Sequence, residues 1–143
     1  MKNSKKVVRL FVTCIVFISC YGHAQNNVAG QEVIDTLRKF YTDYTKEWST
    51  DTGFTLKRKI YSLRKKICTS KLLKPMADNL DYDPLINNYA TDIVHLNTLI
   101  VIKDSAKANT YIISYDAPGL LKPNIIHVKV VKEKGIYKID SAW

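Results

Sequence analysis

Residues 125–139 read IIHVKVVKEKGIYKI, and this stretch decides the fold class. Apolar and polar residues alternate in its first half, in the order Ile126, His127, Val128, Lys129 and Val130. This alternation has the period of a strand with one buried face. The segment KEKG then predicts a tight turn in which Gly135 takes a positive φ, and IYKI returns along the first half. The stretch therefore predicts an antiparallel hairpin.

Two further strands are expected upstream of this hairpin. TYIISY (110–115) places three residues on one face, namely Tyr111, Ile113 and Tyr115. TLIVI (98–102) is a short, continuously apolar run, which is typical of a central strand. Together the segments predict a curved antiparallel sheet of about four strands in the C-terminal part of the chain.

The N-terminal part has helical periodicity instead. Between residues 28 and 48, apolar side chains recur at helical spacing, at Ile34, Leu37, Tyr41, Tyr44 and Trp48. STDTGF then breaks the helix, and Thr55 is placed to cap a second one. A third, short helix is expected from Thr69 or Ser70, with a kink or a fresh turn at Pro75. Helices followed by hairpin strands predict an α+β fold, with the helices packed on one face of the sheet.

The first 24 residues have the three parts of a secretory signal peptide: a basic start, the apolar run LFVTCIVFIS and the small residues Gly22 and Ala24. The apolar run is shorter than the about 20 residues that span a membrane. A cut after Ala24 would release residues 25–143 as a single domain. A cut before Cys20 would leave that cysteine to carry lipid and tether the protein to a membrane. We expect export, with the protein either free in the periplasm or tethered to the envelope through Cys20.

The charge of the chain limits its partners. The full chain has a net charge of +9, but its leader contains four basic residues and no acid. The remainder has 18 basic and 13 acidic residues, a net charge of +5. An exported basic protein seldom meets nucleic acid, so we expect an acidic protein or an anionic envelope component as the partner, and no nucleic acid.

One segment concentrates this positive charge. Six of the ten residues from 57 to 66 are cations: Lys57, Arg58, Lys59, Arg64, Lys65 and Lys66. They are interpreted either as a docking surface for an anionic partner or as the solvated side of an amphipathic helix. In the first interpretation, the partner-binding residues are Lys57, Arg58, Arg64 and Lys65.

Catalytic and metal sites are not expected. Asp81 and Asp83 offer oxygen ligands, but Pro84 follows them and the glycine and closing glutamate of a calcium loop are absent. These aspartates are better suited to holding a turn. The acid–base candidates Asp43, Asp116 and His127 fall outside the predicted buried faces, and His95 has no second ligand within reach by spacing. Cys14 and Cys20 lie in the leader, so removal of the leader leaves Cys68 alone, and one cysteine cannot form an internal disulfide. Because Cys68 follows the apolar Ile67, it is interpreted as a buried packing residue.

Several segments resemble one known family. They are the exported leader, VIDTLRKFYTDY (33–44), KKICTSKLL (65–73), LDYDPLINN (80–88) and VVKEKGIYKID (130–140). Together they are similar to domain of unknown function 3828, found in exported and lipoprotein-like chains of Gram-negative bacteria. The resemblance implies a cystatin-like or nuclear-transport-factor-two-like cone, in which a curved sheet wraps a helix. It brings no catalytic residues, because that cone hosts many functions.

A pocket between sheet and helix would be lined by Tyr111 and Tyr115, whose buried hydroxyls need partners. The function expected from these observations is an exported, non-catalytic binding domain of the cell envelope that needs no cofactor and no metal. A narrower alternative is a periplasmic immunity protein that inhibits a toxin aimed at the cell wall or membrane. A small isomerase or hydrolase of the cone fold is the other alternative.

Overall fold

A computed structural model describes the protein over four ranges, residues 30–78, 82–88, 91–116 and 121–143. The chain separates into two compact units, residues 1–33 and residues 34–143. The expected leader, with its alternative cuts beside Cys20 and Ala24, lies outside the described residues. Within the four ranges, no helix combines the length and the apolar character that crossing a membrane requires.

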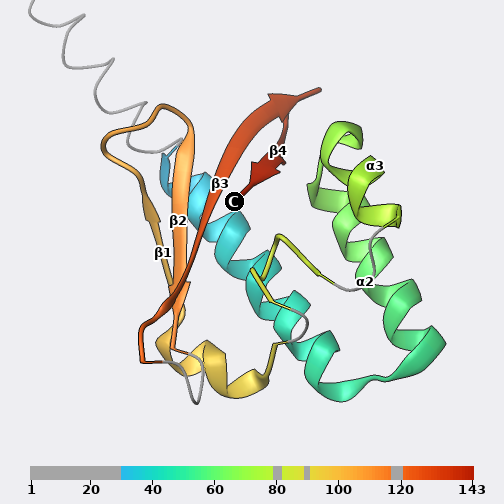
Figure 1. The fold of residues 1–143 in the computed structure, drawn as a ribbon. Helices are drawn as coiled ribbons and strands as arrows, with labels where there is room; N and C mark the ends of the chain where they lie inside the picture. Colours follow the sequence, from blue (N-terminus) through green and yellow to red (C-terminus); the bar gives the residue numbers. More distant parts are fainter. Residues whose placement is uncertain (1–29, 79–81, 89–90, 117–120) are drawn as a thin grey trace, which may run out of the picture. The chain divides into compact units, whose positions relative to one another are not determined.

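Four antiparallel strands form one sheet in the order β1-β2-β3-β4 (Figure 1). Their bounds are Ile100–Lys103 (β1), Thr110–Tyr115 (β2), Asn124–Glu133 (β3) and Ile136–Ala142 (β4). Ile113 of β2 lies opposite Val101 of β1 and Ile126 of β3, which aligns the buried residues across the sheet. The predicted β3–β4 hairpin is confirmed, and Gly135 in its turn has a φ of +84°.

One face of the sheet is buried. Its buried residues are Val101, Tyr111, Ile113, Tyr115, Ile126, Val128, Val130 and Ile139. The predicted alternations of β2 and β3 are therefore confirmed. The prediction of a central strand at 98–102 is wrong, because β1 lies at the edge of the sheet and Ile100 and Ile102 are about half exposed. The start of that apolar run instead ends a short 3-10 helix, η1 (Ile93–Thr98).

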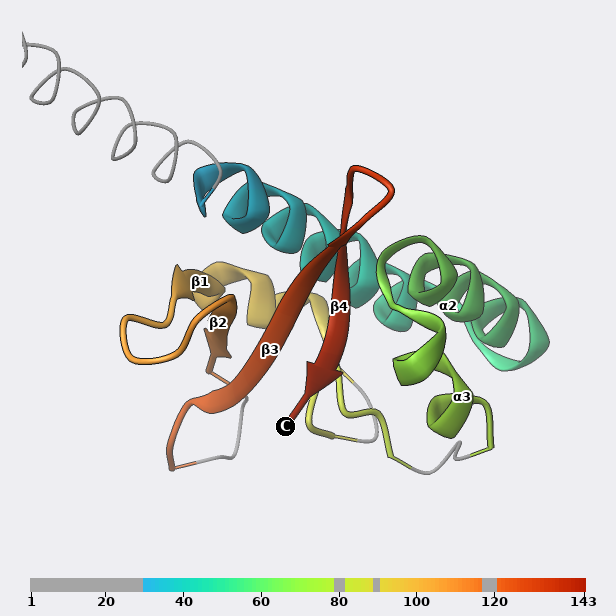
Figure 2. The same ribbon diagram turned by 90° about the horizontal axis from the view of Figure 1, so that it is seen from above.

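Helices cover the buried face (Figures 1 and 2). The first helix is described over residues 30–50, and the buried residues of its later turns are Leu37, Phe40, Tyr41, Tyr44 and Thr45. Helices α2 (Gly53–Ile67) and α3 (Ser70–Asp78) lie beside β4. The chain between them bonds to the β4 edge, where the Thr69 N–H donates to the Ile139 carbonyl at 2.9 Å. The predicted α+β fold, with N-terminal helices on a four-stranded antiparallel sheet, is confirmed.

The helix ends differ in part from the prediction. Thr55 does not cap α2, because α2 begins at Gly53 and has Thr52 as its N-terminal flanking residue. The Thr69 hydroxyl accepts a hydrogen bond from the Leu72 N–H at 3.3 Å, so Thr69 does hold the start of α3. Pro75 lies inside α3, which continues to Asp78.

Candidate functional site

Arg64 turns away from the other cations of α2. Its side chain is only 12% exposed, and its Nη2 lies 2.8 Å from Oδ2 of Asp83. Its Nε donates a second hydrogen bond to the Tyr44 hydroxyl at 2.7 Å. The assignment of Arg64 to a partner-binding surface is therefore wrong. An ion pair that is almost out of water joins α2 to the segment 82–88 instead.

Tyr44 and Asp83 complete this buried network. The Tyr44 hydroxyl donates to Oδ2 of Asp83 at 2.5 Å, and Oδ1 of Asp83 accepts from the Leu85 N–H at 3.0 Å. Burial, with the nearby Asp83 charge, raises the pKa of Tyr44 well above its ordinary value. The phenol therefore stays neutral and remains a donor. Each charge of the pair has several hydrogen-bond partners, which is the condition under which a buried ion pair is tolerated.

Asp83 also closes the segment 82–88 on itself. Its N–H donates to the Asn88 carbonyl at 3.0 Å, and its carbonyl accepts from the Ile86 N–H at 3.2 Å. Leu85 and Ile86, between these bonds, are completely buried. The turn-holding role expected for Asp83 is thus what the geometry gives, while Asp81 lies outside the described residues. Over the described part of the chain, no three His, Cys, Asp or Glu side chains gather as metal ligands.

The same segment is bonded to the sheet on its other side. The Ile86 carbonyl accepts from the Tyr115 hydroxyl at 2.8 Å and from Nδ2 of Asn124 at 2.7 Å. Tyr111 and Tyr115, expected to line a pocket, are 5% and 4% exposed within the packed interior. Burial raises the pKa of both. Because the Tyr115 hydroxyl donates its hydrogen bond to the Ile86 carbonyl, we infer that Tyr115 anchors the segment 82–88 to the sheet.

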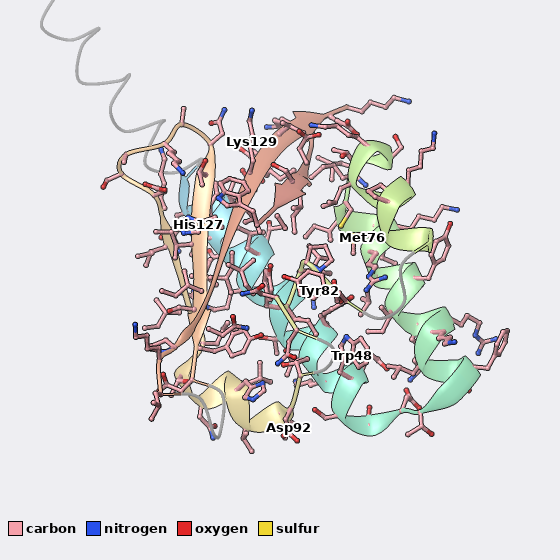
Figure 3. All side chains as sticks on the ribbon, viewed as in Figure 1. Trp48, Met76, Tyr82, Asp92, His127 and Lys129 are labelled. Carbon is pink, nitrogen blue, oxygen red and sulfur yellow. The ribbon has the colours of Figure 1, made fainter. Side chains whose placement is uncertain are left out.

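Two histidines have structural partners. The His95 ring stacks on Tyr115 with centroids 5.0 Å apart, and its Nδ1 accepts from the Asp92 N–H at 3.1 Å. His127, labelled with Lys129 along β3 in Figure 3, stacks on the Trp143 ring at 5.7 Å. Sequence spacing did not suggest either stack, because each partner lies at least 16 residues away in the chain.

The remaining acid–base candidates are also occupied locally. Asp43 forms an ion pair with Lys39 one helical turn earlier, at 3.1 Å. Asp116 follows the end of β2 with an exposed side chain, and its backbone N–H donates to the Thr98 hydroxyl at 2.9 Å. Neither carboxylate faces one of the two histidines in these contacts. A different acid does: Oδ2 of Asp104 lies 3.9 Å from Nδ1 of His127.

Cys68 is buried, and burial raises the pKa of its thiol from the ordinary 9.0 to about 12. A raised folded-state pKa stabilises the protein below the ordinary pKa, and that stability is lost as the pH rises toward 12. With Cys14→Ser and Cys20→Ser, we expect a thiol reagent at pH 8 to label Cys68 only after unfolding. Between pH 9 and 10, the free energy of unfolding should fall by about 1 kcal/mol more than in Cys68→Ala. Rapid labelling of the folded protein would contradict this assignment.

The exposed side of α2 carries aromatic residues among its cations. Phe54 is 81% exposed and Tyr61 is 54% exposed. With the exposed cations they form the α2 outer stripe, which we define as Phe54, Lys57, Arg58, Tyr61 and Lys65. Residues three and four apart on a helix are neighbours, so these side chains follow one side of α2. The helix contains no acidic residue that could neutralise them.

Other cations near α2 are already engaged. Lys59 bonds to Glu47 at 2.9 Å and to Asp51 at 2.6 Å, which ties α2 to the first helix. The Lys138 ammonium of β4 donates to the carbonyls of Lys65 and Lys66, at 3.4 and 2.6 Å, at the C-terminal end of α2. A cation there complements the helix dipole. Of the six cations of α2, the ion pairs of the described residues engage Lys59 and Arg64 and leave those of the α2 outer stripe and Lys66.

One solved structure is similar to this chain. It is the crystal structure of a protein of unknown function from Bacteroides thetaiotaomicron, with a TM-score of 0.74 and 25% sequence identity. The match covers 87% of this chain and 98% of the other. No model of a known protein family matches the chain, and no curated protein matches it. The comparison supports the α+β fold, and it does not confirm the family or the name of the fold.

Proposed function

We propose that this chain is a non-catalytic binding domain of the cell envelope and that it binds an acidic protein through the α2 outer stripe. One observation carries the proposal: Phe54 and Tyr61 are exposed beside the cations Arg58 and Lys65 on one side of a helix. Aromatic residues and arginine are enriched in protein interfaces, and an unneutralised basic helix favours an acidic partner. Export, and membership of the exported family named above, belong to this proposal.

An acidic protein fits the stripe better than a lipid surface does. A helix that lies in a membrane interface inserts a broad apolar side between the lipids. In α2 the apolar side contains Ile60 and Ile67, and it is already buried within the domain. Only Phe54 and Tyr61 remain for insertion, which is little apolar area for stable membrane binding. Against a protein, the same two rings can fill pockets while the cations pair with carboxylates.

Affinity capture from native cell envelopes tests this proposal. The tagged wild type is compared with Arg58→Glu/Lys65→Glu and with a control of equal charge change, Lys122→Glu/Lys134→Glu, in which two exposed lysines outside α2 are reversed. The captured protein is purified and titrated with each form. We expect the α2 variant to bind about tenfold more weakly or worse, and the control to bind like the wild type.

The dependence on salt and the nature of the partner complete the test. Affinity for an acidic protein should fall as salt rises from 0.05 to 0.5 M, because exposed charges are then screened. Equal binding by the wild type and the α2 variant would overturn the docking role. Binding to vesicles of anionic phospholipid, with no acidic protein captured, would assign the stripe to a membrane instead. Capture of a toxin that attacks the cell wall or membrane would identify the narrower immunity role.

A further inference from the structure

The two edges of the sheet differ in how they are covered. Along β4, the chain after α2 forms a parallel bridge between Cys68 and Ile139, and Thr69 adds a backbone hydrogen bond. At the other edge, β1 has a strand partner on one side only. An open edge offers unpaired N–H and C=O groups to another strand. This difference makes β1 the place where the sheet can be extended.

The register shows which backbone groups of β1 are free. The Asp104 N–H donates to the Thr110 carbonyl, and hydrogen-bonded pairs alternate along an antiparallel ladder. Ile102 and Ile100 therefore direct their backbone groups to β2, whereas Val101 and Lys103 direct theirs outward. Among the backbone hydrogen bonds of the described residues, none uses the outward groups of Val101 or Lys103. These groups can pair with an added strand.

The side chains beside this edge are apolar and exposed. Ile100 is 54% and Ile102 is 50% exposed, on the face of the sheet away from the helices, while Val101 between them is 2% exposed on the buried face. Natural edge strands usually carry charges, proline or bulges that prevent pairing. In β1, the only charged residue is Lys103 at its end. The edge thus combines unpaired backbone groups with unprotected isoleucines.

We propose that a second copy of this chain pairs with β1 in antiparallel orientation, with Val101 opposite Val101 across a two-fold axis. In this register Ile100 lies opposite Ile102 of the second copy, so the four isoleucines form one apolar strip. Lys103 then lies opposite Leu99 of the second copy rather than opposite another lysine, which like-charge repulsion would disfavour. Self-complementarity of this kind is what a two-fold interface requires. The result is one sheet continuous across both copies.

Sedimentation equilibrium tests this inference on the protein expressed from its full sequence. We expect a dimer whose dissociation constant rises by at least about tenfold in Ile102→Lys, because the two-fold axis introduces each change twice. Ile102 is half exposed, so circular dichroism should show an unchanged fold. The matched control is Ile125→Lys, an equally exposed residue of β3 two strands from the edge, and it should leave the dimer intact. A monomer at every concentration up to about 1 mM would overturn the proposal, as would a dimer lost only in the control.

Disulfide trapping tests the register itself. Residues opposite each other in a non-hydrogen-bonded pair have Cα atoms about 4.5 Å apart, within the range of a disulfide. In a background with Cys14→Ser and Cys20→Ser, Ile100→Cys mixed with Ile102→Cys should form a cross-linked dimer on mild oxidation. Neither variant alone should form the cross-link, because each cysteine is then offset by two residues from the same cysteine of the second copy. Cross-linking in the separate samples, or none in the mixture, would overturn the register.

Discussion

Replacing Asp83 with asparagine is expected to lower the free energy of unfolding by about 3–5 kcal/mol. The change keeps the size of the side chain and an oxygen for the Leu85 N–H, but it removes the charge that pairs with Arg64. A guanidinium that is largely out of water is then left uncompensated. The loss should be measured by denaturant unfolding at pH 7, followed by circular dichroism.

The matched control for this prediction is Asp116→Asn. It makes the same chemical change at an exposed carboxylate, so the free energy of unfolding should stay within about 0.5 kcal/mol of the wild type. If Asp83→Asn were as mild as its control, the buried pair would contribute little. The segment 82–88 would then be held mainly by Leu85 and Ile86, which are completely buried.

The secondary structure was largely predictable because local pattern and tertiary environment agree. In β3, each residue of the predicted apolar set, Ile126, Val128 and Val130, is buried on the helix-covered face. The run at 98–102 was wrongly predicted to be a central strand, whereas β1 lies at the edge of the sheet. A continuously apolar strand has no alternation of apolar and polar residues that would distinguish an edge strand from a central one. The order of strands is a long-range property that such a run does not contain.

Arg64 shows how much of the site could be predicted from the sequence. Arg64 lies four residues after Ile60 and three before Ile67, so it falls on the apolar side of α2 rather than among the outward cations. That spacing could have removed it from the docking surface. Its partner Asp83 could not have been named, because nothing in the sequence brings α2 to a turn 19 residues later. The exposure of Phe54 likewise could not be predicted, because the turn residues around it did not indicate which side of a helix it would occupy.

Replacing Arg64 with methionine should cost about as much at pH 7, about 3–5 kcal/mol. The Asp83 carboxylate would then be buried without its cation, although it would keep its hydrogen bonds with the Tyr44 hydroxyl and the Leu85 N–H. The loss should be measured by denaturant unfolding followed by circular dichroism, as for Asp83→Asn.

Each deficit is measured against Lys65→Met at the same pH, since this neighbouring exposed lysine controls for the loss of one positive charge. The double variant Arg64→Met/Asp83→Asn leaves neither charge buried alone. It should therefore be less destabilised than the sum of the two single variants, with a coupling of up to about 3 kcal/mol. Single changes whose effects simply add in the double variant would contradict an ion pair at the centre of this network. The hydroxyl and the ring of Tyr44 would then account for the role of Arg64, because its guanidinium contacts both.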